Sequence, residues 1–188
     1  MMHQTQHIDV SSVLRQTLAC DLYSNLVTRP TGAAVRGQIE HMLGESMERA
    51  YAVIDFSQVT MIDFSCADEV VAKLLIRYVA EDSPQEAYFL FRGVNDDHRD
   101  AIESALERHG LALAIEQADG VGLLGVLSDT ERRAWDVAYR LGPVDATDVA
   151  REIGADGVET QAALEALGRR RLVMQIDGQF VAVGSARG

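Results

Sequence analysis

Apolar residues in the first two thirds of the chain fall into two kinds of run. Short, nearly continuous runs are typical of strands buried on both faces, and they occur at residues 51–56, 87–91 and 111–115. Between them, apolar residues recur three and four positions apart, which predicts helices over residues 30–44, 65–79 and 95–110. This alternation predicts an α/β fold with a small mixed sheet packed against helices.

The helix expected over residues 65–79 begins with a serine. Ser65 is followed three positions later by Asp68, which is the spacing of a capping box. The apolar face of this helix comprises Ala67, Val70, Val71, Leu74, Leu75 and Tyr78. We therefore expect the Ser65 hydroxyl at a helix N-terminus shortly after a strand, where the helix dipole favours an added negative charge.

The pattern changes at Ser128. Ser128 and Glu131 have capping-box spacing at the start of one helix, and Asp145 caps a shorter one. The third helix has its expected apolar positions at Val158, Ala162, Leu164 and Leu167. A β-hairpin turning at residues 177–178 follows. Three short helices and a hairpin, in this order, resemble a winged helix over about 55 residues, an α+β fold.

The chain is acidic, and its charge is uneven. Its 188 residues carry a net charge of -12, with 9 Lys and Arg against 19 Asp and Glu in residues 1–127, and 8 against 10 in residues 128–188. The charge asymmetry and the change of pattern predict two domains, residues 1–125 and 128–188, joined near Gly125. The overall charge argues against general affinity for nucleic acid.

Composition is that of an ordinary globular protein. Hydrophobic residues make up 47% of the chain, and no apolar run approaches the ~20 residues of a membrane span. The N-terminus is polar, so we expect a cytoplasmic location, no membrane association and no fixed structure in residues 1–7. We expect no disulfide framework, cofactor or metal, because metal-ligand spacing is lacking among Cys20, Cys66, His3, His7, His41, His98 and His109.

The strand, turn and helix start between residues 53 and 75 carry a family resemblance. The strand ends in Ile54, Asp55 and Phe56, the turn contains Val59, and the helix starts at Ile62, Asp63, Phe64 and Ser65. This order resembles the STAS domains, the fold of bacterial anti-sigma-factor antagonists, whose helix starts with Asp-Ser-Ser-Gly. The chain departs from that motif at Phe64, where STAS domains have a serine, and at Cys66, where they have glycine.

Ala67, Asp68 and Glu69 match a second pattern, as does the segment FLFRGVNDDHRDAIESAL at residues 89–106. Both resemble the STAS-like family, whose helix starts with Ser, an aromatic residue and Ala-Asp-Glu; Cys66 stands in the aromatic position. The resemblance covers roughly residues 8–120. It implies a protein-interaction domain whose partner is a histidine-kinase-like ATPase or an anti-sigma factor, with the contact surface around Asp63, Ser65, Asp68 and Glu69.

Ser65 has two interpretations. The resemblance implies a phospho-acceptor, and a phosphate there would add about two negative charges at a helix N-terminus. The alternative is an ordinary N-cap worth ~1 kcal/mol. We favour the cap, because Asp68 and Glu69 in the first turn would repel a phosphate.

Other reactive side chains have structural explanations. Asp55 and Asp63 lack a nucleophile or base partner nearby, and we expect Cys66 to be an inert, half-buried thiol. The triad-like set Asp97, His98 and Asp100 falls in the first turn of one helix, where acidic residues are expected. We therefore predict no catalytic residues and no enzyme activity.

In a winged helix the third helix would enter the DNA major groove. Its expected outward positions are Glu159, Thr160, Gln161 and Glu165, and positive charge follows at Arg169, Arg170 and Arg171, with Arg132 and Arg133 as further candidates. DNA binding through Thr160, Gln161 and these arginines, expected to be weak, and docking to a protein both stay open.

Two hypotheses follow for function. The first is a cytoplasmic bacterial regulator in which a STAS-like protein-interaction domain is coupled to a winged helix and acts in transcriptional control by binding a partner. The second is a DNA-binding transcriptional regulator whose STAS-like part serves only for dimerisation, as a homodimer, or for ligand sensing.

Overall fold

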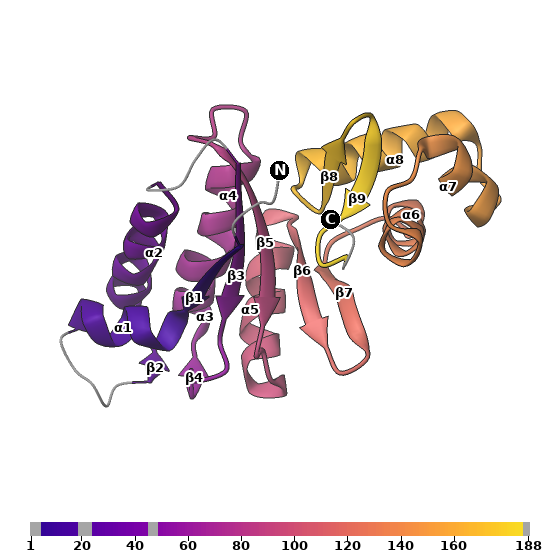
Figure 1. Ribbon diagram of the computed structural model, residues 1–188. Coiled ribbons are helices and arrows are strands. Elements are labelled where there is room, and N and C mark those ends of the chain that lie inside the picture. Colours follow the sequence, from indigo (N-terminus) through magenta and orange to yellow (C-terminus); the bar gives the residue numbers. More distant parts are fainter. Residues whose placement is uncertain (1–4, 19–23, 45–48, 186–188) are drawn as a thin grey trace.

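A five-stranded sheet forms the centre of the computed structural model, which describes residues 5–18, 24–44 and 49–185 (Figure 1). The strands lie in the order β1-β3-β5-β6-β7, and all neighbours are parallel except β6 and β7. Their bounds are β1 Thr5–Asp9, β3 Arg49–Asp55, β5 Glu86–Arg92, β6 Ala112–Gln117 and β7 Gly120–Gly125. The expected mixed α/β class is confirmed.

Helices cover one face of this sheet. They are α1 Val10–Leu18, α2 Arg29–Gly44, the continuous helix formed by α3 Phe64–Ala67, the π-helical η1 Asp68–Lys73 and α4 Leu74–Val79, and α5 Asp96–His109. Alternate strand residues such as Ala52, Ile54 and Phe89 form a buried core with these helices. The short parallel pair β2 Asn25–Leu26 and β4 Met61–Ile62 leads into α2 and α3.

The C-terminal part contains three helices and a hairpin. They are α6 Asp129–Leu141, α7 Ala146–Ile153, α8 Gly157–Arg169, β8 Val173–Ile176 and β9 Gln179–Ala182. The expected caps at Ser128 and Asp145 are confirmed. The expected buried face of α8 is wrong in part, since Val158 is 79% exposed. Helical spacing explains this, because Leu164 and Leu167 share a face with Thr160 and Ala163.

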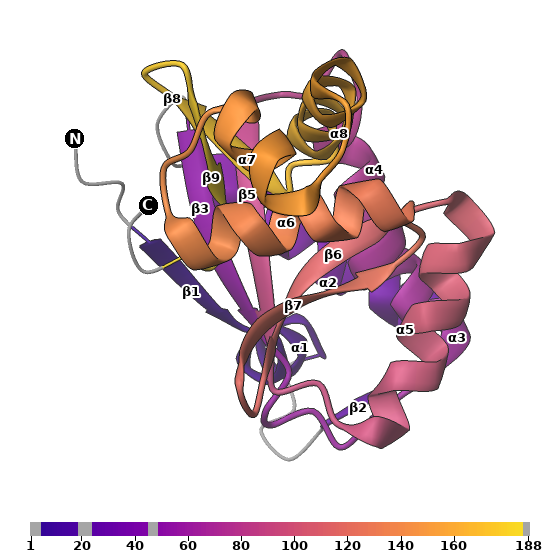
Figure 2. The same ribbon diagram turned by 90° about the vertical axis from the view of Figure 1, so that its right-hand side faces the viewer.

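The C-terminal part lies on the face of the sheet that the other helices leave open (Figures 1 and 2). A buried cluster there joins Tyr88 and Ala114 of the sheet to Met174, Val181 and Val183 of the hairpin segment. This contact follows from the strand pattern, because a parallel sheet is stable only when both faces are covered. The division at residues 125–128 stays a prediction, but the two parts share this cluster across it.

Side chains of α6 complete the outer edge of β7. The Val121 backbone N–H donates to the Tyr139 hydroxyl at 3.2 Å, and Arg132 donates to the carbonyls of Leu123 at 3.4 Å and Gly125 at 2.7 Å. An edge strand otherwise presents unpaired backbone groups that can pair with another chain. Here α6 satisfies three of those groups without adding a sixth strand.

Two strands of the five-stranded sheet, β1 and β7, were not expected from the pattern. The expectation that residues 1–7 lack fixed structure is wrong for residues 5–7, which pair in parallel with Tyr51, Ala52 and Val53. Polar side chains are tolerated at such an edge, so the pairing leaves no apolar signal. Residues 1–4 lie outside the described part of the chain. The glycine-rich β7 also lacks an alternating pattern that would mark a strand.

Replacing Arg132 by alanine tests the edge contact. Arg132→Ala leaves two partly buried carbonyls without their charged donor, so we expect a loss of about 1–3 kcal/mol in the free energy of unfolding. Arg140→Ala on the same helix is the matched control, because Arg140 forms only an exposed pair with Glu152 and should change stability by less than about 1 kcal/mol. Urea denaturation measures both; equal effects would contradict the assigned role.

Candidate functional site

Asp63, and not Ser65, caps the helix that begins at Phe64. One Asp63 carboxylate oxygen accepts the Cys66 backbone N–H at 2.8 Å, and the other accepts the Thr28 backbone N–H at 3.0 Å. Ser65 is the second residue of α3 and is half-buried. The predicted Ser65 cap is therefore wrong. Asp63 is favoured because one side chain satisfies both a helix terminus and the loop before α2.

Asp68 and Glu69 are buried in an ionic cluster, which we define as these two acids with Arg29, Arg36, Lys73 and His109. Arg29 contacts both carboxylates at 2.7 Å, and His109 Nε2 lies 2.7 Å from Asp68. Glu69 also contacts Arg36 at 3.3 Å and Lys73. The two acids are only 3% and 2% exposed, so their expected place on a partner-binding surface is wrong.

Local backbone features bring this cluster together. The acids start the π-helical stretch η1, whose wider turn lets two consecutive side chains face α2 and α5. Gly32 of α2 allows the close approach, since a Cβ atom there would lie 3.0 Å from both Glu69 Cβ and Cys66 Cα. Burial raises the pKa of each carboxylate. Hydrogen bonds from Arg29 and His109 to Asp68, and from Lys73 and Arg29 to Glu69, outweigh this effect, so the net pKa shift of both acids is downward.

Cys66 is an inert thiol, as expected, although it is fully rather than half buried. Its Sγ donates to the Thr28 carbonyl at 2.9 Å. Burial is the main cause that raises the pKa of Cys66 to about 12, and the negative charge of Asp63 adds to it. The thiol therefore stays protonated and lacks the thiolate that nucleophilic chemistry requires. Cys20 lies outside the described residues.

Asp55 and His98, two of the residues considered for acid–base chemistry, each have their own structural partners. Asp55 accepts the Ser57 backbone N–H and pairs with Arg92, both at 2.8 Å. Burial raises the pKa of Asp55, but these two partners outweigh it and the net pKa shift is downward. His98 is buried and forms the capping box of α5 with Asn95, whereas Asp97 and Asp100 are exposed. The structure therefore assembles no triad from these residues.

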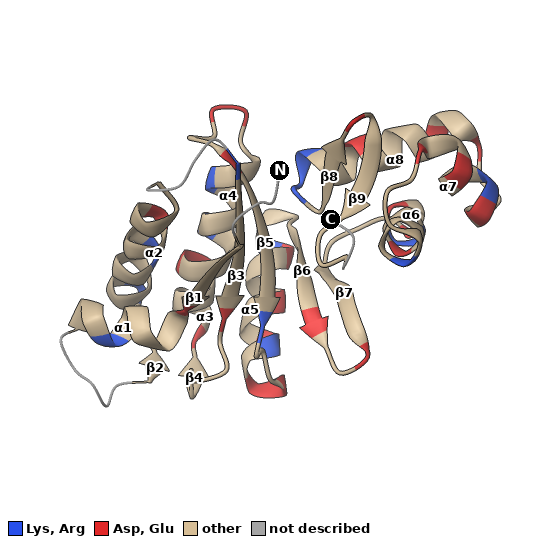
Figure 3. Ribbon diagram, viewed as in Figure 1, with Lys and Arg blue, Asp and Glu red and all other residues tan. Residues whose placement is uncertain are grey.

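The basic run after α8 is turned toward the rest of the protein. Arg170 donates to the Val126 carbonyl at 2.6 Å and the Gly110 carbonyl at 3.1 Å. Arg171 donates to the Tyr78 carbonyl at 3.1 Å, with its guanidinium 5.9 Å from the centre of the Tyr88 ring. Figure 3 shows this basic segment at the end of α8 nearest the sheet. Arg170 and Arg171 are thus turned toward the rest of the protein, so they do not form the expected outward patch for a DNA backbone.

Arg132 and Arg133 are engaged in the same way, with backbone carbonyls of β7 and of Ile153 respectively. Arg169 remains exposed. The expected outward position of Thr160 is wrong, because its side chain is buried and its hydroxyl donates to the Asp156 carbonyl at 2.8 Å. Gln161 donates to Glu165 at 2.7 Å. The exposed residues of α8 before Arg169 are acidic or apolar: Val158, Glu159, Ala162 and Glu165.

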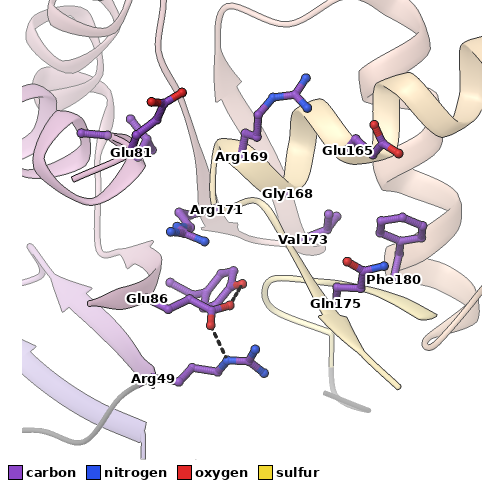
Figure 4. Close-up of a pocket in the computed structure, with 13 residues that line it drawn as sticks. Arg49, Glu81, Glu86, Glu165, Gly168, Arg169, Arg171, Val173, Gln175 and Phe180 are labelled. Carbon is purple, nitrogen blue, oxygen red and sulfur yellow. Dashed lines mark hydrogen bonds and ion pairs between the residues drawn. The ribbon is translucent and has the colours of Figure 1, made fainter. Parts of the chain in front are cut away.

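A cleft of about 690 Å³, beside the buried cluster that joins the two parts, is lined by residues of both the sheet and the C-terminal part (Figure 4). Its floor contains an ion pair of 3.0 Å between Arg49 and Glu86, and the Tyr88 hydroxyl donates to the same carboxylate. Arg171 lines it from the other part of the chain. Sequence reasoning missed this site because its residues come from three distant segments with no common motif.

Comparison with profiles of known protein families and with curated proteins found no match for this chain. Within the described ranges, no group of His, Cys, Asp and Glu side chains is arranged to hold a metal ion. The helices of that same part of the chain are all too short or too polar to cross a membrane.

Capping by Asp63 can be separated from any contribution of Ser65. Asp63→Ala should lower the free energy of unfolding by ~0.5–2 kcal/mol, because two backbone N–H groups lose their acceptor. Ser65→Ala, the neighbouring control, should change it by less than about 0.5 kcal/mol. Chemical denaturation of both variants provides the measurement. A larger loss for Ser65→Ala would reverse the assignment.

The ionic cluster predicts a pH dependence of stability. A carboxylate whose folded-state pKa is lowered stabilises the fold at neutral pH, and this contribution is lost as pH falls from about 5 through the folded-state pKa. Glu69→Gln should therefore unfold more easily than wild type at neutral pH, with a smaller difference near pH 3. Glu103→Gln is the control, since Glu103 forms an exposed pair with Arg99. Thermal unfolding at several pH values tests this; a pH-independent difference for Glu69→Gln would exclude it.

Proposed function

We propose that this protein is a bacterial cytoplasmic regulator that acts by binding another protein, with a STAS-like domain coupled to a winged-helix domain in transcriptional control. The observation that carries the proposal is the internal engagement of Arg170 and Arg171 by backbone carbonyls. Binding to a DNA backbone depends on cationic side chains on the outer surface, where they neutralise phosphates and release counterions. In this fold, the arginines best placed for that role hold the two parts of the chain together.

The exposed face of α8 supports protein docking over DNA docking. Glu159 and Glu165 on this face would repel phosphates, while Val158 is 79% exposed and offers an apolar contact. A protein surface with an apolar centre and a basic rim would complement this arrangement. By the STAS-like resemblance, the partner would be a histidine-kinase-like ATPase or an anti-sigma factor.

Control by phosphorylation at Ser65 belongs to the same proposal. The half-buried Ser65 lies in the first turn of a helix that Asp63 already caps. A phosphate there would stand beside an existing carboxylate and weaken the helix start, which would alter the adjoining surface.

A DNA titration separates the proposed function from its alternative. Labelled duplex is titrated by fluorescence anisotropy with wild type and Arg169→Ala, the variant lacking the exposed arginine of the basic run. We expect no saturable binding at physiological salt for either protein. Tight binding by wild type, with a log–log salt slope that flattens by about 0.9 in Arg169→Ala, would favour the DNA-binding regulator.

The protein-binding arm uses purified histidine-kinase-like ATPases and anti-sigma factors from the source genome. Val158→Asp should weaken binding at least tenfold, because it replaces the exposed apolar side chain at the start of the α8 face with a third acid. Leu141→Asp is the control, since Leu141 is 39% exposed at the end of α6. Equal affinities for wild type and Val158→Asp would show that α8 is not the docking surface.

A further inference from the structure

We propose that the cleft between the sheet and the C-terminal part binds a small anion through a carboxylate or phosphate group held by Arg49 and Arg171. The two arginines come from opposite sides of the cleft, one from β3 and one from the segment after α8. The anion-binding arginines are separate from the proposed partner surface, which adjoins the cleft at Glu165. Its volume, about 690 Å³, lies within the range of small-molecule sites, roughly 300–1,000 Å³.

Both guanidinium groups are held in place by their Nε atoms. Arg49 Nε pairs with Glu86 at 3.0 Å, and Arg171 Nε donates to the Tyr78 carbonyl at 3.1 Å. Within residues 5–18, 24–44 and 49–185, no hydrogen bond or ion pair engages the terminal nitrogens of either side chain. Each arginine therefore presents donors in a fixed orientation, and guanidinium donors suit the oxygens of a carboxylate or phosphate.

The charges at the floor of the cleft favour an anion. Burial raises the pKa of Glu86, but the Tyr88 hydroxyl and Arg49 outweigh it, so the net pKa shift is downward and Glu86 stays ionised. Burial, with the neighbouring Glu86 carboxylate, raises the pKa of Tyr88, which remains a donor. The floor thus carries two positive charges and one negative charge, leaving one positive charge for a ligand.

The rim of the cleft carries further charges of both signs. Glu81, Glu165 and Arg169 are exposed there, and Figure 4 shows the two carboxylates directed away from the space between Arg49 and Arg171. Water screens such exposed charges more strongly than those at the partly buried floor. The rim therefore leaves the preference of the floor in place.

The backbone at Arg171 supports a role for its side chain. Arg171 has φ of 61°, in the left-handed region that residues other than glycine rarely adopt. Glycine would occupy this position without strain. Here the strained residue turns a guanidinium back over Tyr88 and into the cleft. An anion bound between Arg171 and Arg49 would also join the two parts of the chain.

Thermal unfolding of the full chain tests the site with two probes, inorganic phosphate and citrate, each against sodium chloride of equal ionic strength. Ligand binding to the folded state raises the unfolding midpoint in a saturable way. We expect such a rise for wild type and for Arg140→Gln, a distant control. A saturable rise with phosphate alone means that the site takes a phosphate group, and a rise with citrate alone means that it takes a carboxylate. A rise with both means that it accepts either group.

Arg49→Gln and Arg171→Gln should abolish the rise. Arg171→Gln also removes a contact between the two parts of the chain, so circular dichroism is used to check that this variant folds. If it does not fold, the result for Arg49→Gln alone decides the test. Arg49→Lys, which keeps the charge without the fork, should weaken binding at least several-fold in calorimetry. No rise beyond the chloride control, or an undiminished rise in Arg49→Gln, would overturn the proposal.

Discussion

Burial of both faces of the parallel sheet is the constraint on which this structure depends. The N-terminal helices cover only one face, on which Ile54 and Phe89 contribute to the main core. Tyr88 and Ala114 on the opposite face need another cover, and the hairpin segment supplies it through Met174 and Val181. The C-terminal part is thus a structural layer of the fold as well as a candidate recognition module.

Docking of this layer determines what its arginines can do. Arg170 and Arg171 reach back to carbonyls at the ends of α4 and α5 and to the connection before α6. Charged donors to backbone carbonyls make stronger hydrogen bonds than neutral ones. The same contacts that fix the layer withdraw positive charge from the outer surface and place Arg171 in the cleft. Under the proposed function, recognition by the C-terminal part would therefore use the acidic and apolar face of α8.

Local signals in the sequence predicted most of the elements and failed where distant residues decide the outcome. The caps at Ser128 and Asp145 follow from neighbouring residues, and both are present. At the start of α3 the sequence pattern predicts Ser65 as the cap, whereas Asp63, which also contacts Thr28, is the cap in the structure. In the sequence, Asp68 and Glu69 resemble ordinary first-turn acids, because their contacts with Arg29 and His109 come from other helices.

The candidate cleft lay beyond sequence reasoning for a related reason. Arg49 and Glu86 are far apart in the chain and meet through the pairing of β3 with β5. Only the docking of the C-terminal part adds Arg171 to them. The strand β1 was missed because its pairing at the sheet edge requires no apolar pattern. Long-range contacts of this kind depend on topology, which local periodicity does not specify.

The closure of the β7 edge by α6 has a consequence for synthesis of the chain. Translation delivers β7 before α6, so the nascent sheet has an open, glycine-rich edge until residues 129–141 emerge. One face of the sheet stays uncovered until the hairpin segment follows. A fragment released at that stage could extend its sheet by pairing with another fragment. The later segment α6 thus protects the β7 edge against pairing with another chain once residues 129–141 have folded onto it.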